Sequence, residues 1–92
     1  MQSDRVRVSP LVRGSISGDG LVLLDVQGGV VLASNVVGAC IWRLIEEQRD
    51  TLEIARSIAA EFGVDQDRAA RDVEAFVAAL CARGLVSRHR PC

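Results

Sequence analysis

The pattern of apolar and polar positions along the chain changes its period at Asn35. Before this residue, apolar residues form short extended runs that glycines interrupt. After it, they recur every three or four residues, as in amphipathic helices. The pattern therefore predicts an α+β chain in which β-strands come first and three helices follow.

Three strands are expected in the first part. The first begins near Val6 and reaches Leu11 or Val12, with Pro10 at its end or at an edge position, because proline has no backbone N–H to donate. The glycines between residues 14 and 20 predict a loop after this strand.

The second and third strands are expected at Leu21–Val26 and Val30–Ala33. The turn at 27–29 contains two glycines, which reach positive φ at little cost. A hairpin of these two strands follows, and the first strand is expected to pair alongside it.

The first helix is expected to start after Ser34 or Asn35, both good N-caps, and to end at the break at residues 48–49. Asp50 and Glu53 have the spacing of a capping box, which predicts the start of the second helix. Gly63 is expected to end this helix.

The third helix is expected to open at Asp65 or Asp67 and to end at Gly84. Its core stripe is Ala69, Val73, Phe76, Val77 and Leu80. Leu85 and Val86 then return to the core. We expect one domain over residues 1–92, with residues 1–5 and 88–92 frayed.

Composition excludes several classes of protein. The net charge is −1, and all 11 basic residues are arginine, so a polyanion is not expected as the main partner. The three cysteines are widely spaced, without a C-x-x-C pair, which argues against a zinc site or a disulfide framework and favours the cytoplasm. Neither a signal peptide nor a membrane span is expected.

The residues offer no apparatus for catalysis. His89 is the single histidine and lies in a basic tail, and the carboxylates at the start of the third helix are expected from the helix dipole alone. Asp65 and Asp67 are too few for a metal site. We therefore expect a binding protein that is not an enzyme and that has no cofactor and no metal.

Nucleic acid is not expected as a partner. Helices two and three have the order of a helix-turn-helix motif, and the third would be the reading helix. Residues 65–83 carry four carboxylates and three arginines, however, for a net charge of −1. Such a helix cannot neutralise phosphates, which supply most non-specific affinity for DNA.

Two features point to peptide binding. The third strand has no charge or proline to protect its edge, and an unprotected edge can pair with an incoming strand. Beside the core stripe of helix three, Ala75 and Ala79 leave a shallow apolar trough, with Arg68 and Asp72 at its upper end.

The stretch from Leu24 to Val86 resembles the PqqD-like family, also called RiPP recognition elements. The resemblance rests on the order and spacing of Leu24-Asp25, Gly29, Asn35-x-x-Gly38-Ala39-x-Ile41-Trp42-x-Leu44, Thr51-Leu52-Glu53-Ile54-Ala55, Phe62, Asp72-Val73, Leu80 and Gly84-Leu85-Val86. Two positions depart from the pattern: Ser34 replaces a common leucine, and the turn at 47–49 lacks the usual glycine.

The resemblance implies a winged-helix-like fold with a three-stranded antiparallel sheet followed by three helices. It also implies a role: the leader segment of a ribosomally made precursor peptide adds as a strand to strand three, packs on helix three and is presented to a modifying enzyme. Lasso-peptide pathways, where the enzyme is a leader protease, are the preferred setting. A carrier for a radical-SAM enzyme in pyrroloquinoline quinone synthesis is the alternative, and a winged-helix DNA-binding protein is a distant third.

The expected binding residues lie on these two elements. Val30 and Leu32 are expected to face the bound leader and Val31 the opposite side, since side chains alternate along a strand. Arg68 and Arg71 could pair with an acidic leader. The full expected set is Val30, Val31, Leu32, Ala33, Arg68, Arg71, Asp72, Ala75, Phe76 and Ala79.

Overall fold

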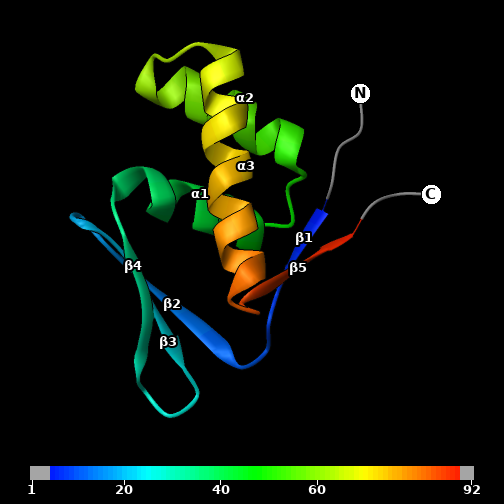
Figure 1. The fold of residues 1–92 in the computed structure, drawn as a ribbon. Helices are drawn as coiled ribbons and strands as arrows, with labels where there is room; N and C mark the ends of the chain where they lie inside the picture. The colour runs from blue at the N-terminus through cyan, green and yellow to red at the C-terminus, as the bar shows by residue number, and fades with distance from the viewer. Residues whose placement is uncertain (1–4, 90–92) are drawn as a thin grey trace.

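The computed structural model describes residues 5–89, which form two antiparallel sheets and three helices (Figure 1). One sheet has the strand order β2-β3-β4, and the other pairs β1 with β5. The elements are β1 (Arg5–Val8), β2 (Val12–Ser17), β3 (Gly20–Asp25), β4 (Val30–Ser34), α1 (Val36–Glu46), α2 (Thr51–Phe62), α3 (Gln66–Ala82) and β5 (Val86–His89). The expected three-stranded sheet and the three helices that follow it are confirmed.

The first strand of the sheet is not the one that the sequence predicted. The expected strand from Val6 to Val12 is split in two, because the chain turns at Ser9, whose carbonyl accepts from the amide of Val12 at 3.2 Å. Pro10 lies in this turn. Only β2 joins the hairpin of β3 and β4, whereas β1 pairs elsewhere.

The prediction of a loop between residues 14 and 20 is also wrong, since most of these residues belong to strands. Gly14 pairs with Leu23 inside β2, and the turn is confined to residues 18–19. A Cβ at Gly14 would lie 2.9 Å from Cδ1 of Trp42. Glycine is therefore present here because the indole of α1 packs directly on the backbone of β2.

A β-bulge interrupts the pairing of β3 and β4. Leu32 faces Leu23 and Val30 faces Leu24, so Val31 is the additional residue. An additional residue breaks the alternation of sides along a strand. Val31 and Leu32 consequently both pack against the core, while Val30 and Ala33 are exposed. The expectation that Val31 faces away from Leu32 is therefore wrong.

The first helix begins at the second of the two expected caps. Ser34 is the last residue of β4, and the side chain of Asn35 accepts from the amide of Gly38 at 3.0 Å. At the other end, Gln48 takes the left-handed conformation with φ 63°. Glycine takes this conformation at less cost, and the turn at 47–49 contains none.

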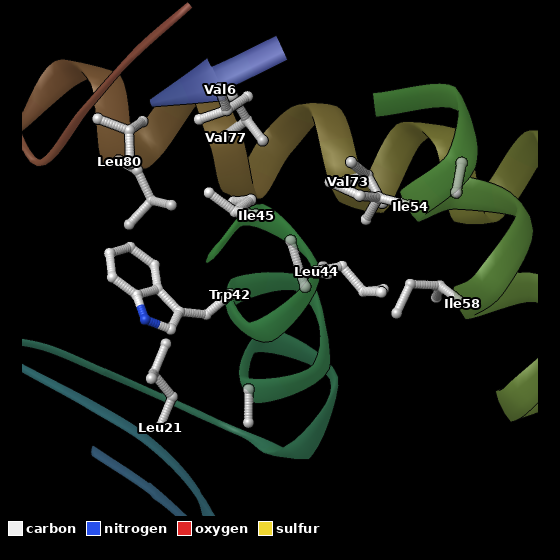
Figure 2. Packing of buried hydrophobic residues seen from close by; sticks show 14 of the residues in the cluster. Val6, Leu21, Trp42, Leu44, Ile45, Ile54, Ile58, Val73, Val77 and Leu80 are labelled. Atoms are coloured by element: carbon white, nitrogen blue, oxygen red, sulfur yellow. The ribbon is translucent and has the colours of Figure 1, made fainter. Parts of the chain in front are cut away.

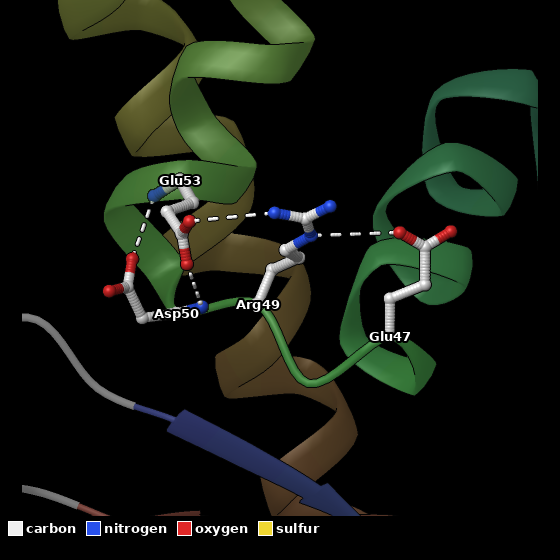
Figure 3. A network of polar contacts seen from close by, with 4 residues as sticks. All are labelled: Glu47, Arg49, Asp50 and Glu53. Atoms are coloured by element: carbon white, nitrogen blue, oxygen red, sulfur yellow. Dashed lines mark hydrogen bonds and ion pairs between the residues drawn. The ribbon is translucent and has the colours of Figure 1, made fainter.

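The second helix has the predicted capping box (Figure 3). The Asp50 side chain accepts from the amide of Glu53 at 2.8 Å, and the Glu53 side chain accepts from the amide of Asp50 at 3.2 Å. Arg49 bridges this helix start to α1 through ion pairs with Glu53 at 3.7 Å and Glu47 at 3.6 Å. Gly63, with φ 64°, ends the helix as expected.

In the C-terminal part of the described chain, Arg88 and His89 lie in β5, although the sequence analysis expected residues 88–92 to fray. β5 pairs with β1 in the register Arg5↔His89 to Val8↔Val86. Arg88 donates to both carboxylate oxygens of Glu74 on α3, at 2.7 and 2.8 Å. Arg5, Ser87, Arg88 and His89 therefore belong to the fold, and residues 1–4 and 90–92 lie outside the described range.

The core lies where α1 meets the sheet and the other two helices (Figure 2). Trp42 is fully buried at its centre, between Leu21 of the sheet and Leu80 of α3. Ile45, Ile54, Val73 and Val77 continue the core between the helices. Over residues 5–89, none of the helices is long and apolar enough to cross a membrane.

Candidate functional site

β4 is an edge strand, as the sequence analysis expected. It pairs with β3 on one side, and within the described residues no strand pairs with its other side. Edge strands in proteins usually carry a charge or a proline that blocks further pairing. The sequence Val30-Val31-Leu32-Ala33-Ser34 contains neither, so the edge can accept another strand.

One flank of α3 faces β4. At about 100° per residue, Phe76, Arg83, Asp72, Ala79 and Ala75 follow one another around this flank, beside the core stripe. Phe76 reaches the start of α1, where a Cβ at Gly38 would lie 3.1 Å from its Cε1 atom. Arg83 donates from Nη1 to the backbone carbonyl of Val31 at 3.0 Å.

These two side chains connect α3 to β4, although the two backbones are not close neighbours. Within the described residues, the closest backbone neighbours of α3 are α2 and β5, not β4. Figure 1 shows α3 between β4 on one side and the β1–β5 pair on the other. The same Cβ at Gly38 would lie 2.7 Å from Cβ of Ser34, which places Phe76 at the Ser34 end of β4, whereas Arg83 is at the Val31 end.

The two contacts are separated by similar distances along α3 and along β4. Seven residues of α3 separate Phe76 from Arg83, a rise of about 10 Å. Three residues of β4 separate Val31 from Ser34, again about 10 Å. We call this region the β4–α3 window and define it by Val31, Leu32, Ser34, Phe76, Ala79 and Arg83.

The window has an apolar floor. Val31, Leu32 and Phe76 are half-buried and pack against the core, and Ala79 is exposed on the same flank of α3. Ala75 lies one step further out, and Asp72 lies at the N-terminal end of the flank. Leu32, Phe76 and Ala79 of the expected site thus belong to the window, and Val31, which was expected to face away, is half-buried like Leu32.

The remaining expected residues lie elsewhere. Val30 and Ala33 face the outer side of the sheet: Ala33 because it alternates with Leu32, and Val30 because the bulge adds a residue between it and Leu32. Arg68 pairs with Asp72 at 4.0 Å, with both side chains exposed. Arg71 is exposed and lies about 140° around α3 from Phe76. The bulge, which moved Val30, left no signal in the sequence.

Arg83 is the functional candidate that sequence reasoning missed. It follows the last residue of α3, and in the sequence it is one of three arginines between residues 65 and 83. A helical projection puts it within about 20° of Phe76, which would have placed it beside β4. The neighbouring Gly84, with φ 72°, follows Arg83 directly at the end of the helix.

Potential metal ligands and reactive thiols are sparse among the described residues. No cluster of three or more His, Cys, Asp or Glu residues occurs among residues 5–89. Cys40 and Cys81 are half-buried and pack against the core. Burial, and then the nearby Glu61 carboxylate, raise the pKa of the Cys40 thiol despite the opposing effect of Arg43. The thiolate is the nucleophilic form, so a raised pKa makes this cysteine a weak nucleophile.

Comparisons with known proteins agree on one family. The family model described as coenzyme PQQ synthesis protein D (PqqD) matches residues 20–86. Comparison with curated proteins gave no match.

Two solved structures have the same fold. The complex of TbiB1 with the TbiA(beta) leader peptide is 34% identical, with a TM-score of 0.78, and the match covers 88% of this chain and 94% of that one. A lasso peptide synthetase B1 complexed with its leader peptide is 25% identical, with a TM-score of 0.77, over 90% of this chain and 98% of that one.

Proposed function

The chain belongs to the PqqD family, and from this premise we propose that it binds the leader segment of a lasso-type precursor peptide and presents it to a modifying enzyme, a leader protease. The observation that carries the proposal is the unprotected edge of β4 beside an apolar flank of α3. Both solved neighbours are in complex with leader peptides and one of them is a lasso peptide synthetase B1, which supports this setting over pyrroloquinoline quinone synthesis.

In this proposal the leader enters the β4–α3 window as a fourth strand of the sheet. Its backbone pairs with the free edge of β4. Its side chains alternate, so every second one points towards Leu32, Phe76 and Ala79, and the others continue the outer side of the sheet.

Backbone pairing alone cannot hold the leader. Each hydrogen bond contributes a net of about 0.5–1.5 kcal/mol, and four would give roughly 2–6 kcal/mol. Ordering a flexible leader costs about 2–5 kcal/mol. Micromolar affinity requires about 8 kcal/mol. Apolar leader side chains buried on the floor of the window must supply the difference, at about 1.5–3 kcal/mol for each large one.

The outer side of the sheet is the surface that we propose for the modifying enzyme. The register places Val22, Leu24, Val30 and Ala33 on this side, with Val30 66% exposed. The opposite side, with Leu21 and Leu23, is buried in the core. A leader strand beside β4 would extend the apolar outer side, so an enzyme bound there would contact the domain and its leader together.

The test is to place a charge in the window. We expect Ala79→Glu to weaken leader binding at least tenfold while the fold is kept, because the glutamate must be desolvated beside Leu32 and Phe76 when the leader enters. Ala75→Glu should act in the same direction, and less strongly because it lies further out. Calorimetric titration with the leader peptide of the 34% identical neighbour provides the measurement.

Ala78→Glu is the matched control. Ala78 is also exposed on α3, on the flank that faces away from β4, so the same substitution should leave affinity within about twofold. Equal losses for Ala79→Glu and Ala78→Glu would mean that the leader does not use this flank. No binding by the unchanged protein to any lasso-type leader would reject the proposed function itself.

A further inference from the structure

Arg83 is chemically unlike the rest of the β4–α3 window. The floor is apolar, and β4 carries no charge, but the guanidinium of Arg83 projects from the end of α3 to the start of β4. The bond that the structure gives it ends on a neutral carbonyl, that of Val31. No carboxylate among residues 5–89 pairs with Arg83.

The other charges near the window are already engaged. Arg68 and Asp72, at the N-terminal end of the same flank, pair with each other at 4.0 Å. Asp25, at the hairpin turn next to β4, accepts from the amides of Gln27 and Gly29, both at 2.9 Å. Arg83 therefore places a positive charge without an ion-pair partner among the described residues at one end of the window.

A guanidinium has five N–H donors in a planar fork, and one of them suffices for the Val31 carbonyl. The others are available to a group that enters the window. A carboxylate accepts two such donors at once, whereas a peptide carbonyl accepts them less strongly. An acidic side chain is thus the partner that Arg83 fits best.

We propose that Arg83 is a specificity-determining residue, which selects peptides that carry an aspartate or glutamate beside the Val31 end of β4. The inference rests on the proposed function and deepens it, since it names a feature of the bound peptide. Because Arg83 stands at one end of the window and the apolar floor lies between it and Ser34, the acid must occur at a fixed distance from the apolar anchor residues. Arg83 then sets the register of the added strand.

The experiment is selection from a phage-displayed library of random 15-residue peptides on the immobilised protein. We expect the unchanged protein to enrich apolar residues at alternate positions, together with an acidic residue at one fixed spacing from them. Arg83→Gln removes the charge but keeps a donor for Val31. With this variant the acidic preference should disappear and the apolar preference should remain.

Two further variants complete the test. Arg83→Lys keeps the charge but not the planar fork, and should retain a weaker acidic preference. Arg56→Gln removes the same charge from an exposed position on α2, away from β4, and should select the same peptides as the unchanged protein. Replacing the acid by its amide in the best synthetic peptide should weaken binding to the unchanged protein by about fivefold, as for the upper range of exposed ion pairs, and should not change binding to Arg83→Gln.

The outcomes separate this inference from the proposed function. If the acidic preference persists with Arg83→Gln, or if the unchanged protein selects apolar peptides without any acid, Arg83 is not a selecting residue although the window binds peptides. If the unchanged protein enriches no peptide at all, both this inference and strand addition are rejected.

Discussion

At the scale of single residues, the close packing of a side chain on the backbone explains why residue 14 is a glycine. Gly14 looked like part of a flexible loop, but it lies in β2 beneath the indole of Trp42. Glycine usually weakens a strand, by about 0.5–1 kcal/mol relative to alanine. The buried position of Trp42 explains why the weaker strand former occupies this site.

We expect Gly14→Ala to destabilise the protein. The new Cβ would lie 2.9 Å from Cδ1 of Trp42, which is fully buried and cannot move aside. Overpacking of this kind costs about 1–3 kcal/mol, which outweighs the gain in strand propensity. Chemical denaturation followed by Trp42 fluorescence measures the free energy of unfolding.

Gly18→Ala is the control in the same hairpin. No atom lies within 4 Å of a Cβ at Gly18, so its unfolding free energy should stay within about 0.5 kcal/mol of the unchanged protein. If Gly14→Ala were as stable as Gly18→Ala, the indole would not be packed on the backbone of β2.

At the scale of elements, local signals were sufficient for the helices and the hairpin. Short-range features can be recognised from neighbouring residues alone, such as the capping box at Asp50 and Glu53 and the left-handed Gly63. The β4 edge followed from the absence of charge and proline. The bulge at Val31 could not be predicted from the sequence. It depends on how β4 pairs with β3 and packs on the core at the same time. The outward position of Val30 therefore could not be read from alternation.

The edge of β4 leads to a prediction on hydrogen exchange. When a leader peptide is bound, exchange should slow at two or more of Val30, Val31, Leu32 and Ala33, because their outward amides gain partners. The N-terminal half of α3 should also slow. Exchange in α2 should change little, because α2 packs on α1 and α3 and not on β4. Mass spectrometry on the free and bound protein provides the comparison.

β2 is the internal control, since it is the other edge of the same sheet. Its amides should exchange equally in the free and bound protein. Protection of β2 instead of β4 would place the added strand on the wrong edge. Protection of α2 and α3 with β4 unchanged would indicate a ligand that sits as on a helix-turn-helix protein, and strand addition would be rejected.

At the scale of the whole molecule, the pairing of β1 with β5 joins segments near the two ends of the described chain. The sequence offered no signal for this pairing, because each strand has four residues and the partners lie about eighty residues apart. Short segments near termini are usually frayed unless they are tied down. Here burial ties them down: Val6 and Val86 are 4% and 6% exposed and belong to the core.

The β1–β5 pair should contribute to the free energy of unfolding without affecting the affinity for the leader. Val6→Ala removes two buried methyl groups from the core, which we expect to lower the free energy of unfolding by about 1–3 kcal/mol. Val26→Ala makes the same change at a side chain that is 62% exposed and should cost less than about 0.5 kcal/mol.

Below the unfolding transition, the leader affinity of Val6→Ala should remain within about twofold of the unchanged protein, because β1 lies across α3 from the β4–α3 window. Denaturation and calorimetry on the same samples separate the two quantities. A large loss of affinity in a fully folded Val6→Ala protein would show that the β1–β5 pair positions α3 for binding, and that stability and recognition are coupled in this fold.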